Sequence, residues 1–80
     1  MISKEDIKAL QAMRLQALVN WCGSKSQLAR NLGVSRQVVG GWVKRGRIAA
    51  TYATMVERKT RGEFKREHLR PDVITWVEKV

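Results

Sequence analysis

A short central segment of the chain carries side chains that are suited to hydrogen bonding with nucleic-acid bases and phosphates. Arg36 has a guanidinium group that matches guanine O6 and N7, and Gln37 has an amide that matches adenine N6 and N7. Three further cations follow closely: Lys44, Arg45 and Arg47. Such cations neutralise phosphates, so the segment is a candidate nucleic-acid-binding surface.

The positive charge of the chain is concentrated around this segment. The 80 residues include 16 Lys and Arg but only 7 Asp and Glu, which gives a formal net charge of +9. No carboxylate occurs from Ile7 to Val56, and the segment 23–70 alone accounts for the whole net charge. This distribution favours a polyanion as partner. A solvated basic face that only keeps the protein soluble is the alternative.

Length and composition argue against several other classes of protein. Eighty residues form one domain, 1–80, with little room for a catalytic cleft. A hydrophobic content of 44% is typical of a globular domain. The chain has no recognisable set of catalytic residues, and the single Cys22 and His68 cannot complete a usual zinc site. We expect no enzymatic activity, no cofactor, no metal and no small-molecule ligand.

The sequence contains no apolar run near the roughly 20 residues that cross a bilayer. Residues 1–6 are too polar for the core of a signal peptide. We therefore expect a cytoplasmic protein with no membrane partner.

The elements that position these residues are expected to be helices, beginning with one from Lys4 to about Trp21. Ser3 and Asp6 have the spacing of an N-terminal cap. One apolar stripe, predicted to be buried, comprises Ile7, Leu10, Met13, Ala17, Leu18 and Trp21. A second stripe comprises Leu15, Val19 and Cys22. Two stripes indicate more than one packing partner.

Two shorter helices are predicted next, one over 25–32 and one that follows Ser35 and reaches about Lys44, with Gly33 in the turn between them. Gly33 can adopt positive φ, and Ala29 is small where the helices approach. Serine caps precede both helices, at Ser24 and Ser35. The shared core is predicted to contain Leu28, Leu32, Val34, Val39 and Trp42. This pattern predicts a helix-turn-helix over 25–44, and an ordinary helical hairpin is the alternative.

The run from Gln27 to Trp42, QLARNLGVSRQVVGGW, resembles the helix-turn-helix of phage Cro-type repressors and the related YdaS-like regulators. The ending Leu-Arg-Pro-Asp at 69–72 is similar to the tail of the same group, so the resemblance covers about 15–72. Ala49 replaces the usual Pro, and Gly40 replaces a residue with a side chain. The resemblance implies a compact all-α five-helix bundle of the lambda-repressor-like type, acting as a regulator at the nucleoid of a bacterial host.

Helix geometry selects the residues that would read bases. The side of the third helix opposite its core residues would enter the major groove. The candidate base-reading residues are Ser35, Arg36, Gln37, Val38 and Gly41. For Val38, half-buried packing is preferred over contact with a thymine methyl. Gly40 and Gly41 each cost the helix roughly 1 kcal/mol relative to alanine, which a close approach to DNA explains. The alternative is a helix that ends near Val39.

Phosphate contacts are predicted on both sides of the third helix. The N-terminus of the second helix offers free N–H groups and the positive end of a helix dipole. The candidate phosphate-binding residues are Lys25, Ser26, Gln27, Lys44, Arg45 and Arg47. Plain solvation explains each cation equally well when it is taken singly.

A fourth helix is expected from Ala49 to about Thr60, buried through Tyr52, Met55 and Val56. Trp21 and Trp42 are interpreted as core residues.

The tail, 72–80, fits a helix or a strand equally well. Its candidate dimerisation residues are Val73, Ile74, Trp76 and Val77. Packing of the tail on its own domain, or dimerisation through the second stripe of the first helix, are alternatives.

Two functions compete at this point. The first is a Cro-like phage or prophage repressor that binds double-stranded DNA as a homodimer, weak without DNA, on a palindromic operator. One small domain presents only one recognition helix, which is why a dimer is expected. The second is a YdaS-like antitoxin or recruiting module in which the first helix contacts a protein partner.

Overall fold

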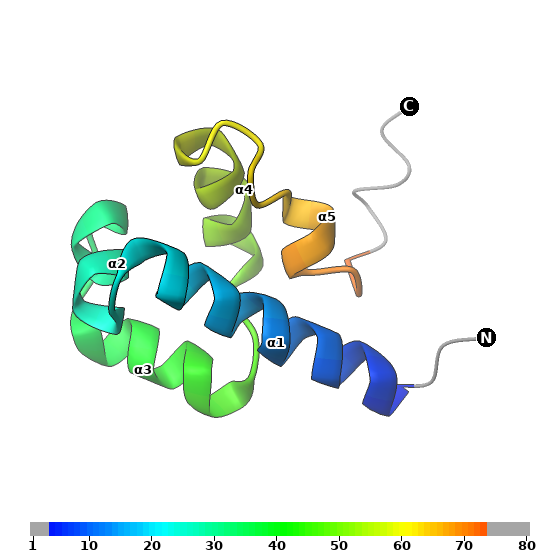
Figure 1. Cartoon of the computed structure of the whole chain (residues 1–80). Helices are drawn as coiled ribbons and strands as arrows, with labels where there is room; N and C mark the ends of the chain where they lie inside the picture. Colours follow the sequence, from blue (N-terminus) through cyan, green and yellow to red (C-terminus); the bar gives the residue numbers. More distant parts are fainter. Residues whose placement is uncertain (1–3, 74–80) are drawn as a thin grey trace.

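The computed structural model describes residues 4–73, and this part of the chain contains five helices and no strand (Figure 1). The helices are α1 (Lys4–Cys22), α2 (Lys25–Leu32), α3 (Arg36–Arg45), α4 (Ala50–Lys59) and α5 (Arg66–Leu69). The predicted all-α, five-helix architecture is confirmed. Of the predicted dimerisation residues, Val73 is half-buried, while Ile74, Trp76 and Val77 lie outside the described residues, as does the tail from 74 onward.

The long helix α1 crosses the molecule, with α2 and α3 packed on one part of it and α5 on another (Figure 1). Every helix contributes to one core, together with Ile48 from the loop that precedes α4. The other buried apolar residues are Leu15, Leu18, Val19, Leu28, Ala29, Leu32, Val39, Trp42, Ala53, Val56 and Leu69. Trp42 is 2% exposed and packs against Tyr52 with ring centroids 5.3 Å apart. Its predicted core role is confirmed.

The turns around α2 and α3 form where the sequence predicted them. The Ser24 hydroxyl oxygen accepts a hydrogen bond from the Gln27 N–H at 3.1 Å, which caps α2. Gly33 ends that helix in the left-handed region, at φ 71°. The Ser35 hydroxyl oxygen then accepts from the Val38 N–H at 3.2 Å and caps α3. Because each cap satisfies an N–H that the helix leaves unpaired, both boundaries are fixed locally.

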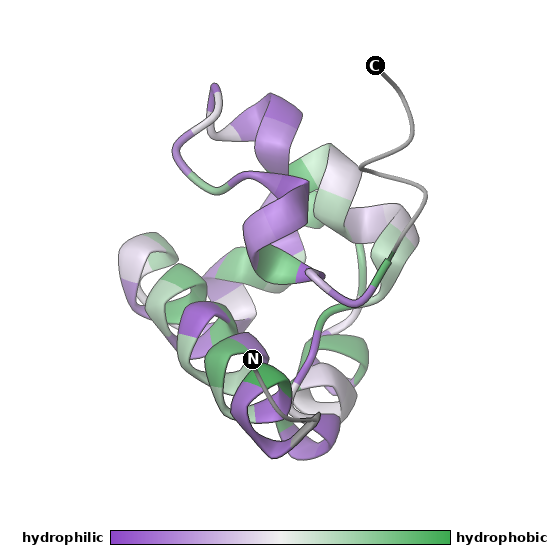
Figure 2. Ribbon diagram, turned by 90° about the vertical axis from the view of Figure 1, so that its right-hand side faces the viewer, coloured by the Kyte–Doolittle hydropathy of each residue, from purple (hydrophilic) through white to green (hydrophobic). Residues whose placement is uncertain are grey.

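The buried side of α1 differs from the predicted one. Met13 is 61% exposed and Trp21 is 57% exposed, so their assignment to the core was wrong, and Ala17 is exposed too. The inward residues are Gln11, Leu15, Leu18, Val19 and, partly buried, Cys22. The second apolar stripe therefore faces the other helices, together with Leu18 of the first stripe. Figure 2 shows why the pattern was ambiguous, because hydrophobic and hydrophilic residues are mixed around the whole of α1.

Candidate nucleic-acid interface

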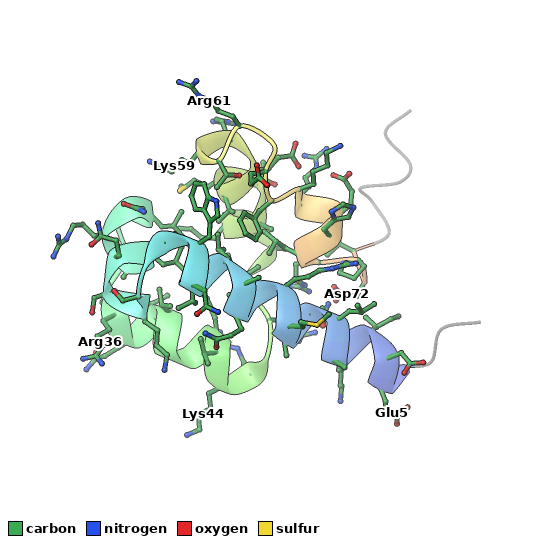
Figure 3. The ribbon with its side chains drawn as sticks, in the orientation of Figure 1. Glu5, Arg36, Lys44, Lys59, Arg61 and Asp72 are labelled. Atoms are coloured by element: carbon green, nitrogen blue, oxygen red, sulfur yellow. The ribbon has the colours of Figure 1, made fainter. Side chains whose placement is uncertain are left out.

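The outward face of α3 presents the residues that were predicted to read bases. Ser35, Arg36 and Gln37 are all exposed at the N-terminal end of the helix. Lys44, the last residue but one of α3, is also exposed. Figure 3 shows Arg36 and Lys44 pointing away from the body along the same lower edge of the molecule. Because Val39 and Trp42 anchor the opposite side of α3, this face is held rigidly outward.

Val38 also belongs to this exposed surface. Its side chain is 41% exposed, so the preferred interpretation of half-buried packing was wrong. The reason is that the core takes the next residue, Val39, which is fully buried. An apolar side chain left on this face is available for contact with a thymine methyl group.

The two glycines lie within α3 and not beyond its end. The helix continues to Arg45 and is closed by Gly46 at φ 81°, so the alternative of an end near Val39 was wrong. A Cβ atom at Gly40 would meet nothing within 4 Å, and one at Gly41 would meet only an Arg45 guanidinium nitrogen at 3.4 Å. Internal packing therefore does not require glycine at either position.

The predicted phosphate-binding residues are all accessible. Lys25, Ser26 and Gln27 are exposed in the first turn of α2, directly after the Ser24 cap. Lys44, Arg45 and Arg47 are exposed around the C-terminal end of α3. Neither α2 nor α3 contains a carboxylate, so no acidic side chain of these helices competes with a phosphate.

Sequence reasoning missed two residues of α1 that lie beside this end of α3. Lys8 and Gln11 line a hollow of about 290 Å³ together with Arg45, Gly46 and Arg47. The one sequence signal for Lys8 was its position in the stretch without carboxylates. Gln11 is 3% exposed. Its burial was not predictable from hydrophobic spacing, because glutamine is not an apolar residue.

The Leu-Arg-Pro-Asp ending forms a clasp, by which we mean the interactions of Arg70 and Asp72 with α1 and the α3–α4 loop. The Arg70 guanidinium donates to both Asp72 carboxylate oxygens at 2.8 Å, and also to the Ile48 carbonyl at 3.0 Å. The Gln11 amide donates to Asp72 at 2.6 Å. Arg47 lies 3.7 Å from the same carboxylate. The clasp therefore connects α1 and the segment after α5 to the loop that follows α3.

The hydrogen bond and charge of Arg70 hold the pKa of Asp72 below its ordinary value, against the opposing effect of burial. The same pairing raises the pKa of Arg70. Both groups therefore keep their charges over the physiological range. Within the clasp, the positive charge of Arg70 therefore offsets the negative charge of Asp72, which lies beside the basic loop.

Two other chemistries find no support in the described residues. Between residues 4 and 73, no group of three His, Cys, Asp or Glu side chains is arranged to hold a metal ion. Partial burial raises the pKa of the Cys22 thiol, which disfavours the reactive thiolate, although a hydrogen bond from Asn31 opposes this shift. No helix in this part of the chain is long and apolar enough to cross a membrane.

Two capped helices joined at Gly33, with an exposed face free of acids on the second helix, define a helix-turn-helix protein. The chain belongs to the YdaS family, because the profile of the family described as "Bacterial toxin YdaS" matches residues 15–78. It is 46% identical over 52 residues to the "Putative transcriptional regulator YdaS" of Escherichia coli (strain K12). That alignment covers 64% of this chain and 53% of the relative, so the match spans about half of that protein.

No solved structure matches the chain. The predicted resemblance to YdaS-like regulators is confirmed by the family match. The resemblance to Cro-type repressors stays a prediction.

Proposed function

We propose that this protein is a transcriptional regulator that binds double-stranded DNA sequence-specifically, with α3 in the major groove. The observation that carries the proposal is the exposed face of α3, which combines Arg36 and Gln37 at its N-terminal end with Lys44 at the other. Arginine and glutamine are side chains that discriminate guanine and adenine by paired hydrogen bonds. The description of the Escherichia coli relative as a transcriptional regulator supports the same role.

The finer proposal is a repressor of the Cro kind that binds a palindromic operator as a homodimer. The described part of the chain presents one helix-turn-helix, which reads one short segment of major groove. Two copies related by a two-fold axis read half-sites on one face of the duplex, and the larger interface supplies the affinity that a regulator needs. We assign the chain no catalytic activity, cofactor or small-molecule ligand.

Selection of binding sites from a pool of random duplexes tests this proposal. We expect one enriched sequence arranged as an inverted repeat, with half-site centres about 10 base pairs apart or a multiple of that spacing. Arg36→Ala and Gln37→Ala should each lose about 1–3 kcal/mol on the selected site and little on random DNA. No enrichment by the wild type would contradict sequence-specific binding. Equal losses on both duplexes would show that these side chains contact only phosphates.

A protein-binding role is the second candidate function. Met13 and Trp21 are large apolar side chains of α1 that stay more than half exposed, although the Trp21 ring packs edge-on against Phe64 with centroids 5.8 Å apart. Trp21 also borders a hollow of about 280 Å³, whose lining includes Cys22 and Leu28. A large apolar side chain that is exposed at the border of a hollow is typical of a protein contact. In this role the chain acts as an antitoxin or recruiting module of the YdaS kind. Met13→Ser and Trp21→Ser test this role. It would be favoured if both variants keep the DNA affinity of the wild type but lose function in the cell.

A further inference from the structure

We propose that Lys8, Arg45 and Arg47 form a site that binds one backbone phosphate of the DNA, which extends the interface from α3 onto α1. The inference rests on the proposed DNA-binding function and adds a site to it. The family profile begins at residue 15, so Lys8 lies outside the part of the chain that the family match covers. The site therefore combines Lys8, which lies before the matched region, with two residues inside it.

The geometry of the site comes from the end of α3. Gly46 turns the chain in the left-handed region, at φ 81°, and brings it against α1. A Cβ atom on Gly46 would lie only 3.6 Å from the Ala12 Cβ. This close approach places Arg45 and Arg47 on the same hollow as Lys8, although 37 residues lie between Lys8 and Gly46 in the sequence.

The hollow has the size and charge that a phosphate needs. Its volume is about 290 Å³, which accommodates a phosphate group with water around it, since a water molecule occupies about 30 Å³ in the liquid. Three of its five lining residues are cations, and none is a carboxylate. Glu5, one helical turn before Lys8, is not among the lining residues. An anion placed here meets three positive charges from two segments of the chain.

Asp72 is a carboxylate that adjoins the site, and hydrogen bonds from Arg70 and Gln11 already offset its negative charge. It lines a neighbouring hollow of about 160 Å³ that shares Lys8, Gln11 and Arg47 with the first. Arg70 and Gln11 hold the carboxylate at 2.6–2.8 Å. The contact to Arg47 is long, at 3.7 Å, and the Arg47 side chain is exposed, so this ion pair is weak. Because a guanidinium has five N–H donors, Arg47 keeps donors for a phosphate.

The position of the site favours a phosphate of the duplex over a free anion. Arg45 directly follows Lys44, which points out of the same lower edge as Arg36 (Figure 3). A duplex that receives the α3 face in its major groove therefore has a backbone running past the end of α3. A phosphate there is contacted from α1 and from the loop together, which fixes the register of the protein on the DNA.

The test compares Lys8→Ala with Lys59→Ala, a matched loss of one exposed lysine. Lys59 lies at the opposite end of the molecule from Arg36 and Lys44 (Figure 3). Affinity for a duplex of random sequence is measured at several salt concentrations. One lost phosphate contact per subunit reduces the slope of log K against log salt by about 0.9, which weakens binding about fivefold at ~0.15 M salt. We expect this change for Lys8→Ala and none for Lys59→Ala. Lys8→Arg should keep the wild-type slope.

The possible outcomes separate this inference from the proposed function. If the wild type binds DNA and Lys8→Ala behaves like Lys59→Ala, the phosphate site is wrong and the proposed function stands. If the wild type binds no duplex, both are wrong. If millimolar inorganic phosphate perturbs the NMR signals of the Lys8 side chain and the duplex does not, the site binds free phosphate, and its assignment to DNA is overturned. Circular dichroism of Lys8→Ala confirms that α1 is intact.

Discussion

Two cationic regions of this molecule use similar numbers of lysines and arginines in different ways. The α3 region combines Arg36, Lys44, Arg45 and Arg47 with no carboxylate in α2 or α3. The α4–α5 region, residues 57–67, mixes five cations with three glutamates. There the Glu57 carboxylate accepts from the backbone N–H of Arg66 at 2.8 Å, and the Arg66 guanidinium lies 3.7 Å from the Glu67 carboxylate. Cation number alone therefore does not define an interface, because acids within the second region reduce its field.

The strongest test of this difference is matched charge reversal. Arg36→Glu combined with Lys44→Glu should reduce affinity for DNA by about 3 kcal/mol or more, because base and phosphate contacts are lost and repulsion replaces them. Lys59→Glu combined with Arg61→Glu changes the net charge by the same amount. Both of those residues lie at the far end of the molecule (Figure 3). Fluorescence anisotropy with one labelled duplex measures both variants.

The control pair should lose far less affinity than the α3 pair. Its loss reflects only the long-range effect of net charge, which salt screens beyond about 10 Å at 0.1 M. Equal losses in the two variants would show that DNA binds through overall charge, and the distinction between the two regions would then be wrong.

The second test concerns Asp72, the acid at the boundary of the α3 region. Asp72→Ala removes the hydrogen bonds from Arg70 and Gln11 and should lower the free energy of unfolding by about 2 kcal/mol near neutral pH. DNA affinity should not fall when the variant is folded, because the change removes a negative charge. Urea denaturation and anisotropy measure the two effects separately. A stability equal to that of the wild type would show that the clasp contributes nothing to the fold.

This stability difference should depend on pH in one direction. The pKa of Asp72 in the folded protein lies below its ordinary value of 3.8. Its contribution is therefore complete above that value and is lost as the pH falls through the lowered pKa of the folded state. Wild type and Asp72→Ala should thus converge in stability under acid, and a difference that grows on acidification would contradict the assigned pairing.

The helix-turn-helix was predictable from sequence because its signals are local. Ser24, Gly33 and Ser35 each act within four residues of their own position, so a short window of sequence contains the cap or the turn. The buried side of α1 was not predictable in the same way. Packing of α1 against α2, α3 and α5 buries Leu15, Leu18 and Val19, and part of this packing comes from residues more than 40 positions later in the chain.

The candidate site was likewise predictable only where one element forms it. The residues of α3 share one helix, and the helical repeat alone places them on one face. Tertiary packing brings Lys8 close to Arg45 and Arg47. Neither the charge of these residues nor their spacing in the sequence predicts this proximity. The exposure of Val38 depended on which of two adjacent valines the core accepts, and hydrophobicity does not distinguish them.

The smallest expected effect tests the shape of the α3 region and not its charge. Gly41→Ala should raise the free energy of unfolding by about 0.5–1 kcal/mol, because alanine has the higher helix propensity. The new methyl meets only the flexible end of Arg45, at 3.4 Å, so the fold accepts it. The helical repeat places Gly41 one turn after Gln37, about 50° to one side of the direction opposite Val39 and Trp42, so its methyl would project from the outward face. Affinity for the selected DNA site should therefore fall while stability rises.

Gly40→Ala repeats this test on the other side of the outward face. Its Cβ meets nothing within 4 Å, so its gain in stability should be similar. The helical repeat places Gly40 about 100° around the helix from Gly41, at an equal angle on the other side of the direction opposite Val39 and Trp42. A loss of affinity in only one of the two variants would therefore show which side of the outward face lies nearer the bases. Thermal unfolding measures the stability of both variants, and fluorescence anisotropy measures their affinity for the selected DNA site. Undiminished affinity in Gly41→Ala would mean that DNA does not approach the helix closely at this position, and the glycine would then lower helix stability without serving the interface.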